Sequence, residues 1–66
     1  MNRETAREAL ERGDIVKIFR IGSPDHPYVG ELTGELKDGT FMFRGNSRGE
    51  TIEIKVISEK IFLGGG

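Results

Sequence analysis

The feature that most constrains this chain is the alternation of residues over positions 28–36, where one of the two sets contains glycine. Alternation with a period of two predicts a β-strand, because successive side chains of a strand point to opposite faces. The inward set is Tyr28, Gly30, Leu32, Gly34 and Leu36, and the outward set is Val29, Glu31, Thr33 and Glu35. Glycine inside a strand indicates a sharp bend or a close approach of another backbone. The stretch therefore predicts a strongly bent antiparallel sheet that closes toward a small barrel.

Residues 2–12 carry the signals of an α-helix that precedes the strands. Asn2 is a favourable N-cap, and Gly13 is a favourable left-handed C-cap. Two pairs of opposite charge stand four residues apart, Arg7 with Glu11 and Glu8 with Arg12. The apolar stripe is narrow and consists of Ala6, Ala9 and Leu10. So narrow a stripe predicts a helix that lies on the rim of the barrel and does not organise its core.

Further strands are predicted on both sides of residues 28–36. Residues 15–21 have branched and aromatic side chains on both faces, which indicates a strand with both faces partly covered. Residues 22–27 contain both prolines and predict a loop, because proline lacks the backbone donor of a strand ladder. Residues 40–44 predict a strand, and residues 50–56 alternate again. In that last stretch the inward residues are Ile52, Ile54 and Val56, and the outward residues are Thr51, Glu53 and Lys55.

Turn-forming residues predict how the later strands are joined. Asp38-Gly39 suits the positive φ values of a type I′ hairpin turn. Residues 45–49 predict the next turn, and residues 57–60 are long enough for one turn of 3₁₀ helix. A short last strand is expected at residues 61–63, followed by a flexible tail at residues 64–66.

These elements predict a mainly β fold, an N-terminal α-helix followed by a five-stranded, strongly bent antiparallel sheet at residues 14–63. The 66 residues leave room for a single domain, residues 1–66, with a thin core. Because the chain has no cysteine, disulfides and thiolate zinc sites are excluded, and association of subunits becomes the expected further support. The apolar runs are too short to span a bilayer, and no apolar signal region follows the N-terminus, which favours a cytoplasmic protein.

A family resemblance rests on two segments, Gly30-Glu31-Leu32-Thr33-Gly34 and Lys55-Val56-Ile57-Ser58-Glu59-Lys60-Ile61. The first resembles the glycine-spaced second strand of the Sm-like small barrels, and the second resembles the break before their last strand. This family includes the bacterial RNA chaperones of the Hfq type and the Sm-like inhibitors of transcription termination. The order of elements is shared with these barrels and with the Src-homology-3-like (SH3-like) barrels. The resemblance implies a barrel whose fourth and fifth strands pair with those of a neighbour to form a ring.

Recognition of RNA does not follow directly from the resemblance. Sm-like proteins that hold uridine-rich RNA usually carry an acidic residue and an asparagine after the glycine-spaced strand, and this chain has Leu36-Lys37-Asp38-Gly39 there. The RNA pocket of the family is therefore not carried over. With 10 basic and 11 acidic residues, the chain has no excess positive charge to attract phosphate over a distance, so any nucleic-acid contact must be local.

Catalytic and metal-binding residues are not expected. His26 is the one histidine, and its nearest possible partners, Ser23 and Asp25, share its proline-bounded loop, which favours a solvated histidine. One histidine with scattered carboxylates does not make a zinc site. Glu31, Glu35 and Glu53 alternate with threonine, as is typical of an exposed strand face. The sequence predicts no enzyme and no cofactor.

The most informative polar cluster is the turn Arg44-Gly45-Asn46-Ser47-Arg48-Gly49. Two arginines there flank glycine-rich backbone whose N–H groups are able to form an anion-binding concavity. The candidate RNA- or anion-binding residues are Arg44, Asn46, Ser47 and Arg48. The alternative interpretation is an ordinary hairpin turn, which favours the same residue types. Phe41 and Phe43 precede the cluster on one strand face and are expected in the core.

The apolar trio Ile61-Phe62-Leu63 places apolar side chains on both faces of an expected edge strand, which favours pairing with a second copy. The candidate interface residues are Ile54, Val56, Ile61, Phe62 and Leu63. The expected function is a noncatalytic Sm-like binding module that contacts RNA or an RNA-handling protein as a homo-oligomeric ring. The alternative is an SH3-like protein-interaction adaptor or inhibitor without nucleic-acid binding, which uses its barrel edge or the rim at Tyr28 and His26.

Overall fold

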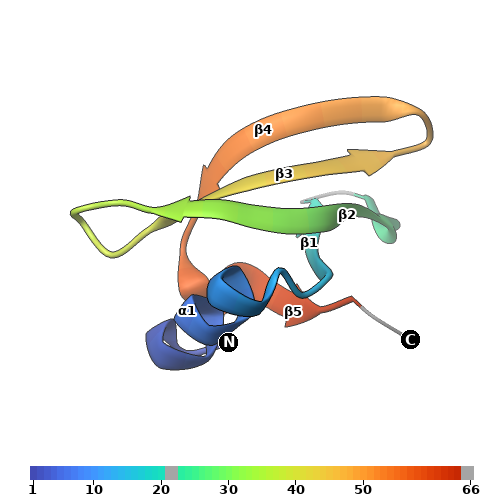
Figure 1. Cartoon of the computed structure of the whole chain (residues 1–66). Coiled ribbons are helices and arrows are strands. Elements are labelled where there is room, and N and C mark those ends of the chain that lie inside the picture. Colours follow the sequence, from blue (N-terminus) through green and yellow to red (C-terminus); the bar gives the residue numbers. More distant parts are fainter. Residues whose placement is uncertain (21–22, 65–66) are drawn as a thin grey trace.

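A computed structural model describes residues 1–20 and 23–64, with only the backbone described at residues 20 and 23–25. The chain begins with one α-helix and continues as five strands with a single 3₁₀ turn before the last strand (Figure 1). The elements are α1 (Arg3–Arg12), β1 (Val16–Arg20), β2 (Ser23–Glu35), β3 (Phe41–Ser47), β4 (Glu50–Val56), η1 (Ser58–Lys60) and β5 (Ile61–Leu63). The predicted helix, the 3₁₀ turn and the short last strand are confirmed.

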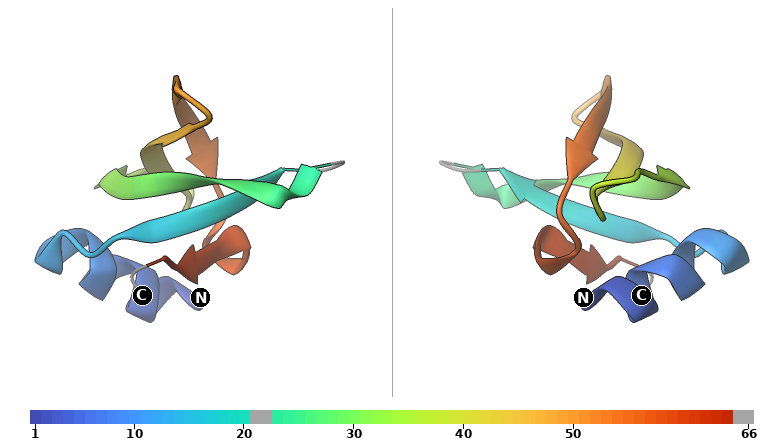
Figure 2. Two further views of the ribbon diagram at one scale, coloured as in Figure 1. Left: turned by 90° about the vertical axis from the view of Figure 1, so that its right-hand side faces the viewer. Right: turned by 90° about the vertical axis from the view of Figure 1, so that its left-hand side faces the viewer.

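The strands form one sheet in the order β4-β3-β2-β1-β5, and every neighbouring pair is antiparallel. The mainly β fold with a five-stranded antiparallel sheet is confirmed, but the predicted strong bending and closure are not. The sheet is open, because β4 and β5 lie at its opposite ends and do not pair with each other. Figure 2 shows the β3–β4 hairpin projecting on the side of the sheet away from α1 and β5. The molecule therefore presents two sheet edges.

The helix forms where its caps predict it. The Asn2 side chain accepts a hydrogen bond from the Thr5 backbone N–H at 2.7 Å, and Gly13 ends the helix with φ of 70°. Ala6 and Ala9 are buried, so the narrow stripe faces the sheet as expected. Of the two expected charge pairs, Glu8 and Arg12 approach to 3.7 Å. The other expectation is wrong, because the guanidinium of Arg7 instead binds Glu35 at the end of β2.

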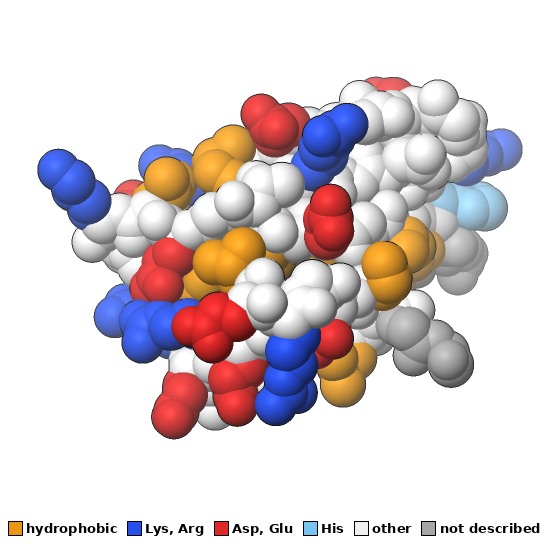
Figure 3. Space-filling model, viewed as in Figure 1, with side chains coloured by type: hydrophobic (Ala, Val, Ile, Leu, Met, Phe, Trp, Pro, Cys, Tyr) orange, Lys and Arg blue, Asp and Glu red, His pale blue; other side chains and the backbone are white. Residues whose placement is uncertain are grey.

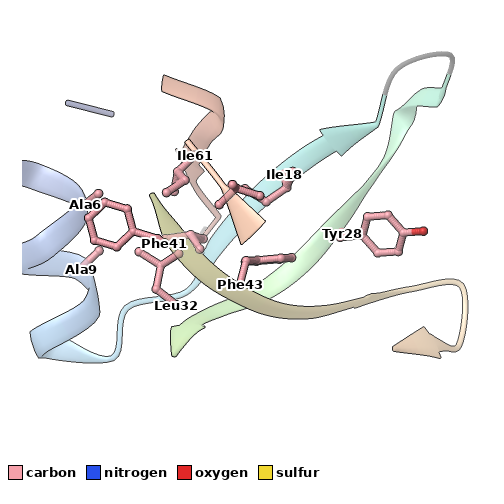
Figure 4. Close-up of a cluster of buried hydrophobic side chains, with 10 residues drawn as sticks. Ala6, Ala9, Ile18, Tyr28, Leu32, Phe41, Phe43 and Ile61 are labelled. Atoms are coloured by element: carbon pink, nitrogen blue, oxygen red, sulfur yellow. The ribbon is translucent and has the colours of Figure 1, made fainter. Parts of the chain in front are cut away.

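The core lies between α1 and the inward face of the sheet. Phe41 packs near Ala6 and Ala9 of the helix, and Tyr28 lies at the far end of the cluster (Figure 4). The predicted core positions Phe41 and Phe43 are fully buried. The full set of buried hydrophobic residues is Ala6, Ala9, Val16, Ile18, Tyr28, Leu32, Phe41, Phe43, Val56 and Ile61.

The N-terminus of the chain lies beside β5. The Met1 ammonium group donates hydrogen bonds to the carbonyl oxygens of Ser58 and Ile61 at 3.1 and 2.7 Å. On the other side, β5 pairs with β1, with Val16 opposite Leu63 and Ile18 opposite Ile61. Within the predicted flexible tail, Gly64 donates a backbone hydrogen bond to Ile15, and residues 65–66 lie outside the described residues.

The predicted loop at residues 22–27 is wrong over most of its length, because β2 begins at Ser23 and runs through both prolines. Residues 21 and 22 lie outside the described residues. The physical reason is one-sided pairing: this part of β2 pairs with β1, and its ladder with β3 begins only at Val29. A strand with one free side tolerates proline, whose missing donor then leaves no partner unsatisfied.

The two hairpin turns differ from the predicted ones. At the first, Gly39 has φ of 85° and its N–H bonds to the Leu36 carbonyl at 3.1 Å, but Asp38 does not have positive φ, so the type I′ assignment is wrong. Positive φ at two successive residues occurs instead at Arg48 and Gly49, with 54° and 85°. The predicted turn at residues 45–49 therefore shrinks to these two residues.

One of the two inward glycines lies at a close crossing of strands. Gly30 faces Gly45 across the β2–β3 ladder, and a Cβ at Gly30 would collide with the backbone of Arg44 and Gly45. Gly34 is different, because a Cβ there would meet no atom within 4 Å. Of the predicted alternatives, a bend or a close approach, Gly30 shows the close approach. Gly34 shows no close approach and follows a register shift, after which it lies opposite Met42 and not on the predicted inward face.

Candidate functional site

The face of the sheet turned away from the core, here called the outward face, carries most of the residues that the sequence singled out. Alternation places these side chains opposite the buried set, as predicted for residues 28–32 and 50–56. The prediction is wrong for Glu35, because a register shift between Leu32 and Gly34 places it opposite the buried Phe41, on the side of α1. In the view of Figure 3 acidic and basic side chains are interspersed and no continuous basic surface is seen. The residues of the outward face are Lys17, Val29, Glu31, Arg44, Asn46, Thr51, Glu53, Lys55 and Phe62, and the exposed ring of Phe19 lies beside Phe62.

Two of the predicted anion-binding residues come together in a hollow of this face. Arg44 and Asn46 line an open depression of about 500 Å³. The remaining lining residues are Ile15, Val29, Gly30, Glu31, Gly45 and Thr51. The depression is thus built from β2, β3 and β4 and from the residue before β1. Its lining includes one basic residue, Arg44, and one acidic residue, Glu31.

The cross-strand neighbours of Arg44 are both acidic. The register places Arg44 opposite Glu31 on β2 and opposite Glu53 on β4. Directly opposite residues of an antiparallel pair have Cβ atoms about 5 Å apart, so both glutamates are cross-strand neighbours of Arg44 on the same face. Within the described part of the chain Arg44 makes no ion pair within 4.0 Å. Glu31, Arg44 and Glu53 thus form a row across three strands with one positive and two negative charges, which weakens the attraction of this row for a phosphate.

The other two predicted anion-binding residues lie at the tip of the hairpin. The Ser47 hydroxyl donates to the carbonyl oxygen of His26 at 3.3 Å, and Arg48 is exposed in the turn. Gly45 and Asn46, expected to offer free N–H groups, pair with residues of both β2 and β4. The predicted backbone concavity is therefore not formed, and a role of these side chains in anion binding remains a prediction.

A cluster that the sequence did not indicate lies at the other end of the outward face. The rings of Phe19 and Phe62 meet edge to face, with centroids 5.5 Å apart and an interplanar angle of 74°. The Lys17 Nζ lies 5.5 Å from the centroid of Phe19. Phe19 and Phe62 are 41% and 45% exposed. These three residues are called the aromatic platform below.

The neighbours of the aromatic platform are apolar. Lys17 lies opposite Val29 on β2 and opposite Phe62 on β5, so no carboxylate stands directly across from it. The predicted partial covering of both faces of the first strand is unequal: Val16 and Ile18 are buried, whereas Phe19 on the other face is 41% exposed and Lys17 is half-buried. The available signal was the presence of apolar residues on both faces of residues 15–21 and 61–63. The pairing of β1 with β5, which brings these residues together, has no signal in the local sequence.

The predicted interface residues divide into two groups. Val56 and Ile61 are buried in the core of the chain itself and present no side chain to a partner. Ile54, Phe62 and Leu63 are 38%, 45% and 66% exposed on the two edge strands. The role of the exposed group in assembly remains a prediction, and the edges themselves are present.

An ion pair holds α1 against the sheet. Arg7 donates from Nε and from a terminal nitrogen to the two carboxylate oxygens of Glu35, both at 2.9 Å. The hydrogen bond from Arg7 lowers the pKa of Glu35 below its usual range, and the same bond raises the pKa of Arg7. Glu35 is thus a structural partner of the helix and not a candidate acid or base.

Asp38, in the segment that departs from the Sm-like pattern, also has hydrogen-bond and ionic partners within the chain. Asp38 accepts hydrogen bonds from the hydroxyl and the backbone N–H of Thr40 and lies 3.6 Å from the Lys55 ammonium group. The bonds from Thr40, and secondarily the charge of Lys55, lower the pKa of Asp38. A hollow of about 400 Å³ lies beside this turn, between the start of α1 and η1. Asp38 stabilises the hairpin turn in this structure.

The groups considered for catalysis and metal binding do not form a site in the described structure. His26 is exposed on β2, and the side chains of Ser23 and Asp25 lie outside the described residues. Within residues 1–20 and 23–64, no three His, Cys, Asp or Glu side chains gather in a way that would hold a metal ion. In the same residues, no helix is long and apolar enough to cross a membrane. Comparison of the chain with protein-family models, curated proteins and solved structures finds no match.

Proposed function

We propose that this chain is a noncatalytic binding module of the Sm-like kind, which contacts single-stranded RNA and associates with copies of itself through its sheet edges. The observation that carries the RNA part is the aromatic platform, an exposed pair of rings with an adjacent ammonium group. Bases of a single strand stack on aromatic side chains, and nearby cations bind the phosphates.

The order and pairing of the elements support the Sm-like part. A helix, two hairpins, a one-turn break and a short last strand follow one another, and the strand order places β4 and β5 at the two ends of the sheet. Gly30 in the glycine-spaced segment lies at a close strand crossing. The resemblance implies that β4 of one copy meets β5 of a neighbour, in a ring. Because a ring of several copies and a smaller assembly differ in mass, light scattering distinguishes them.

The platform is a better place for RNA than the Arg44–Arg48 region. Lys17 is surrounded by apolar neighbours, whereas Arg44 stands between two glutamates. A phosphate that approached Arg44 would also approach both carboxylates, and like charges at this distance repel. We therefore assign the first RNA contact to Lys17, Phe19 and Phe62, with Arg48 as a contact at the hairpin tip.

The test is the affinity for a labelled single-stranded RNA, measured by fluorescence anisotropy at low salt. Phe62→Ala should weaken binding about tenfold, because loss of one stacked base costs about 1–3 kcal/mol. Lys17→Ala should weaken it less and reduce its salt dependence. The matched control is Ile57→Ala, which removes an apolar side chain of equal exposure, 46%, away from the platform. If the unmutated protein does not bind RNA at low salt, the proposal is wrong.

A protein-binding adaptor is the second candidate, and the exposed apolar residues favour it. Ile15, Phe19, Val29, Phe62 and Leu63 are each exposed by more than two fifths, on or beside neighbouring strands. With a net charge of −1, the chain also suits a protein partner better than a polyanion. Capture of one protein in equal stoichiometry without nucleic acid, lost in Phe62→Ala, would favour this function over RNA binding.

A further inference from the structure

We propose that β4 of one copy pairs with β4 of a second copy, antiparallel and centred on Ile54, so that the two sheets join edge to edge in a dimer. This inference rests on the self-association in the proposed function and does not depend on RNA binding. It assigns the partner surface to one edge and fixes the register of the pairing.

The first observation is the free edge of β4. This strand lies at the end of the sheet and contains no proline. Ser47 and Glu50 flank the two-residue turn, so they form a hydrogen-bonded pair, and such pairs alternate along an antiparallel ladder. Glu50, Ile52, Ile54 and Val56 therefore direct their backbone groups toward β3. The N–H and C=O groups of Thr51, Glu53 and Lys55 point to the free side and are open to a partner strand.

The second observation is that the charges of β4 select one register. When Ile54 faces its own copy, Glu53 faces Lys55 of the second copy, and the two-fold symmetry makes this opposite-charge pair twice. Centring the pair on Glu53 places two glutamates opposite each other, and centring it on Lys55 places two lysines opposite each other. Opposite charges across strands stabilise a pair and like charges destabilise it. The charges thus favour one register over its neighbours.

Apolar contacts on the other face agree with this register. Ile54 is 38% exposed although it lies on the inward face of β4, because no other element covers it. In the proposed pairing Ile54 forms the non-hydrogen-bonded central pair, in which the two Cα atoms are about 4.5 Å apart and side chains contact closely. Half-buried Ile52 then faces the Val56 position of the second copy. The contact covers the apolar row that the single chain leaves open.

The outward face of such a dimer has alternating charges. Arg44 lies opposite Glu53 within one chain, and Glu53 would lie opposite Lys55 of the second chain. Arg44, Glu53 and Lys55 of the second copy would then form a row of positive, negative and positive charge across three strands. The Lys55 ammonium, 57% exposed and 3.6 Å from Asp38, lies on a flexible side chain that is able to reach both carboxylates. The second copy thus removes the excess negative charge of the row around Arg44.

The alternative partner for β4, the β5 edge of a neighbour, is less complementary. β5 has three residues against seven in β4, so it offers fewer backbone groups. Its outward side chain is Phe62, which would face Glu53 or Lys55 in place of an opposite charge. Two copies of β4 match each other in length, in apolar pattern and in charge. The pairing of β4 with β4 is therefore preferred to the ring arrangement.

The experiment uses charge reversal at the exposed positions 53 and 55. Sedimentation equilibrium at low salt should give the unmutated chain a mass twice the 7.3 kDa of one copy. Glu53→Lys and Lys55→Glu should each weaken the dimer about tenfold or more, because two attractive pairs become repulsive. The double variant E53K/K55E should restore it. Glu11→Lys and Lys60→Glu, exposed charge reversals away from β4, are the matched controls and should dimerise normally.

Mixing the two single variants gives the most specific result. A chain with lysine at both positions and a chain with glutamate at both should form a heterodimer, although neither dimerises alone. Circular dichroism of each variant confirms that the fold is kept. Failure of the mixture to dimerise, a monomeric unmutated chain, or a ring of five to seven copies would each overturn the β4 pairing. RNA affinity is measured separately on Phe62→Ala, so loss of the proposed function is distinguished from loss of this assembly.

Discussion

The two ends of the outward face hold positive charge in different surroundings. At the β1–β5 end, Lys17 stands among Phe19, Phe62 and Val29, while at the β3–β4 end Arg44 stands between carboxylates. An ammonium group among apolar side chains remains available to an anionic partner, whereas a guanidinium with two glutamates as cross-strand neighbours lies in a row of net negative charge. In this sheet the register of cross-strand neighbours, more than the number of basic residues, distinguishes the surroundings of the two cations.

The largest effect on stability is expected at Gly30, which lies on β2 between the β1–β5 part and the β3–β4 part of the sheet. Gly30 pairs with Val16 of β1 and with Gly45 of β3. Gly30→Ala should lower the free energy of unfolding by about 3 kcal/mol, because its Cβ collides with backbone that cannot move aside. Urea unfolding measures the change. Gly34→Ala is the control and should be close to neutral, since its Cβ enters open space. Equal losses in both variants would show that the crossing is not tight.

An intermediate effect is expected when the carboxylates beside Arg44 are neutralised. The double variant E31Q/E53Q keeps the size of both side chains and removes the negative charges opposite Arg44. RNA affinity should rise several-fold and its salt dependence should steepen by about one ion per freed cation. Fluorescence anisotropy across a salt series measures both. The control is E4Q on the exposed side of α1. An unchanged affinity would mean that cross-strand charge does not separate the two regions.

The smallest effect is a pH dependence of stability that arises at the β2–β3 hairpin. Glu35 and Asp38, at the β2–β3 hairpin, both have a lowered pKa because of hydrogen bonds that their ionised forms accept. A carboxylate with a lowered pKa stabilises the fold above its unfolded pKa, and this contribution is lost as the pH falls through the folded pKa. Stability should therefore decrease in acid below the ordinary carboxylate range.

Thermal unfolding over a pH series tests this expectation. Glu35→Gln should make the acid dependence shallower, and Glu59→Gln, on η1, should leave it unchanged. A steeper dependence in Glu35→Gln would contradict the assignment. Binding at the aromatic platform should not follow this titration, because no carboxylate stands across from Lys17.

Elements that depend on near neighbours in the chain could be predicted. Asn2 and Gly13 mark the helix because a cap acts within a few residues. The alternation of residues 28–32 and 50–56 identifies which side chains face the core, and Phe41 and Phe43 are buried as expected. The register shift after Leu32, which turns Glu35 toward α1, depends on the partner strand and has no local signal. The break at Ser58–Lys60 also follows from local polarity.

Features that depend on distant partners could not be predicted. The predicted type I′ turn at Asp38-Gly39 is wrong. Asp38 and Arg48 both precede a glycine, and the pairing of the strands decides which of the two turns has two successive positive φ values. The prolines of β2 are tolerated because that segment has only one strand partner, a fact of topology. Phe19 and Phe62 meet because β1 and β5 are neighbours, which no local pattern states. The carboxylates opposite Arg44 belong to residues of two flanking strands, Glu31 and Glu53, and no pattern local to residues 44–49 indicates them.

The pairing of β1 with β5 has a consequence for the time course of folding. Val16 and Leu63 lie near opposite ends of the sequence, and the Met1 ammonium joins the same region through Ser58 and Ile61. Contacts between distant residues form late, because a large loop must close before they add stability. The hairpins of β2, β3 and β4 are able to form first, and β1 keeps an open side until β5 arrives. The region that we assign to ligand binding is thus the last to be completed, and mutations there should change the unfolding rate more than the folding rate.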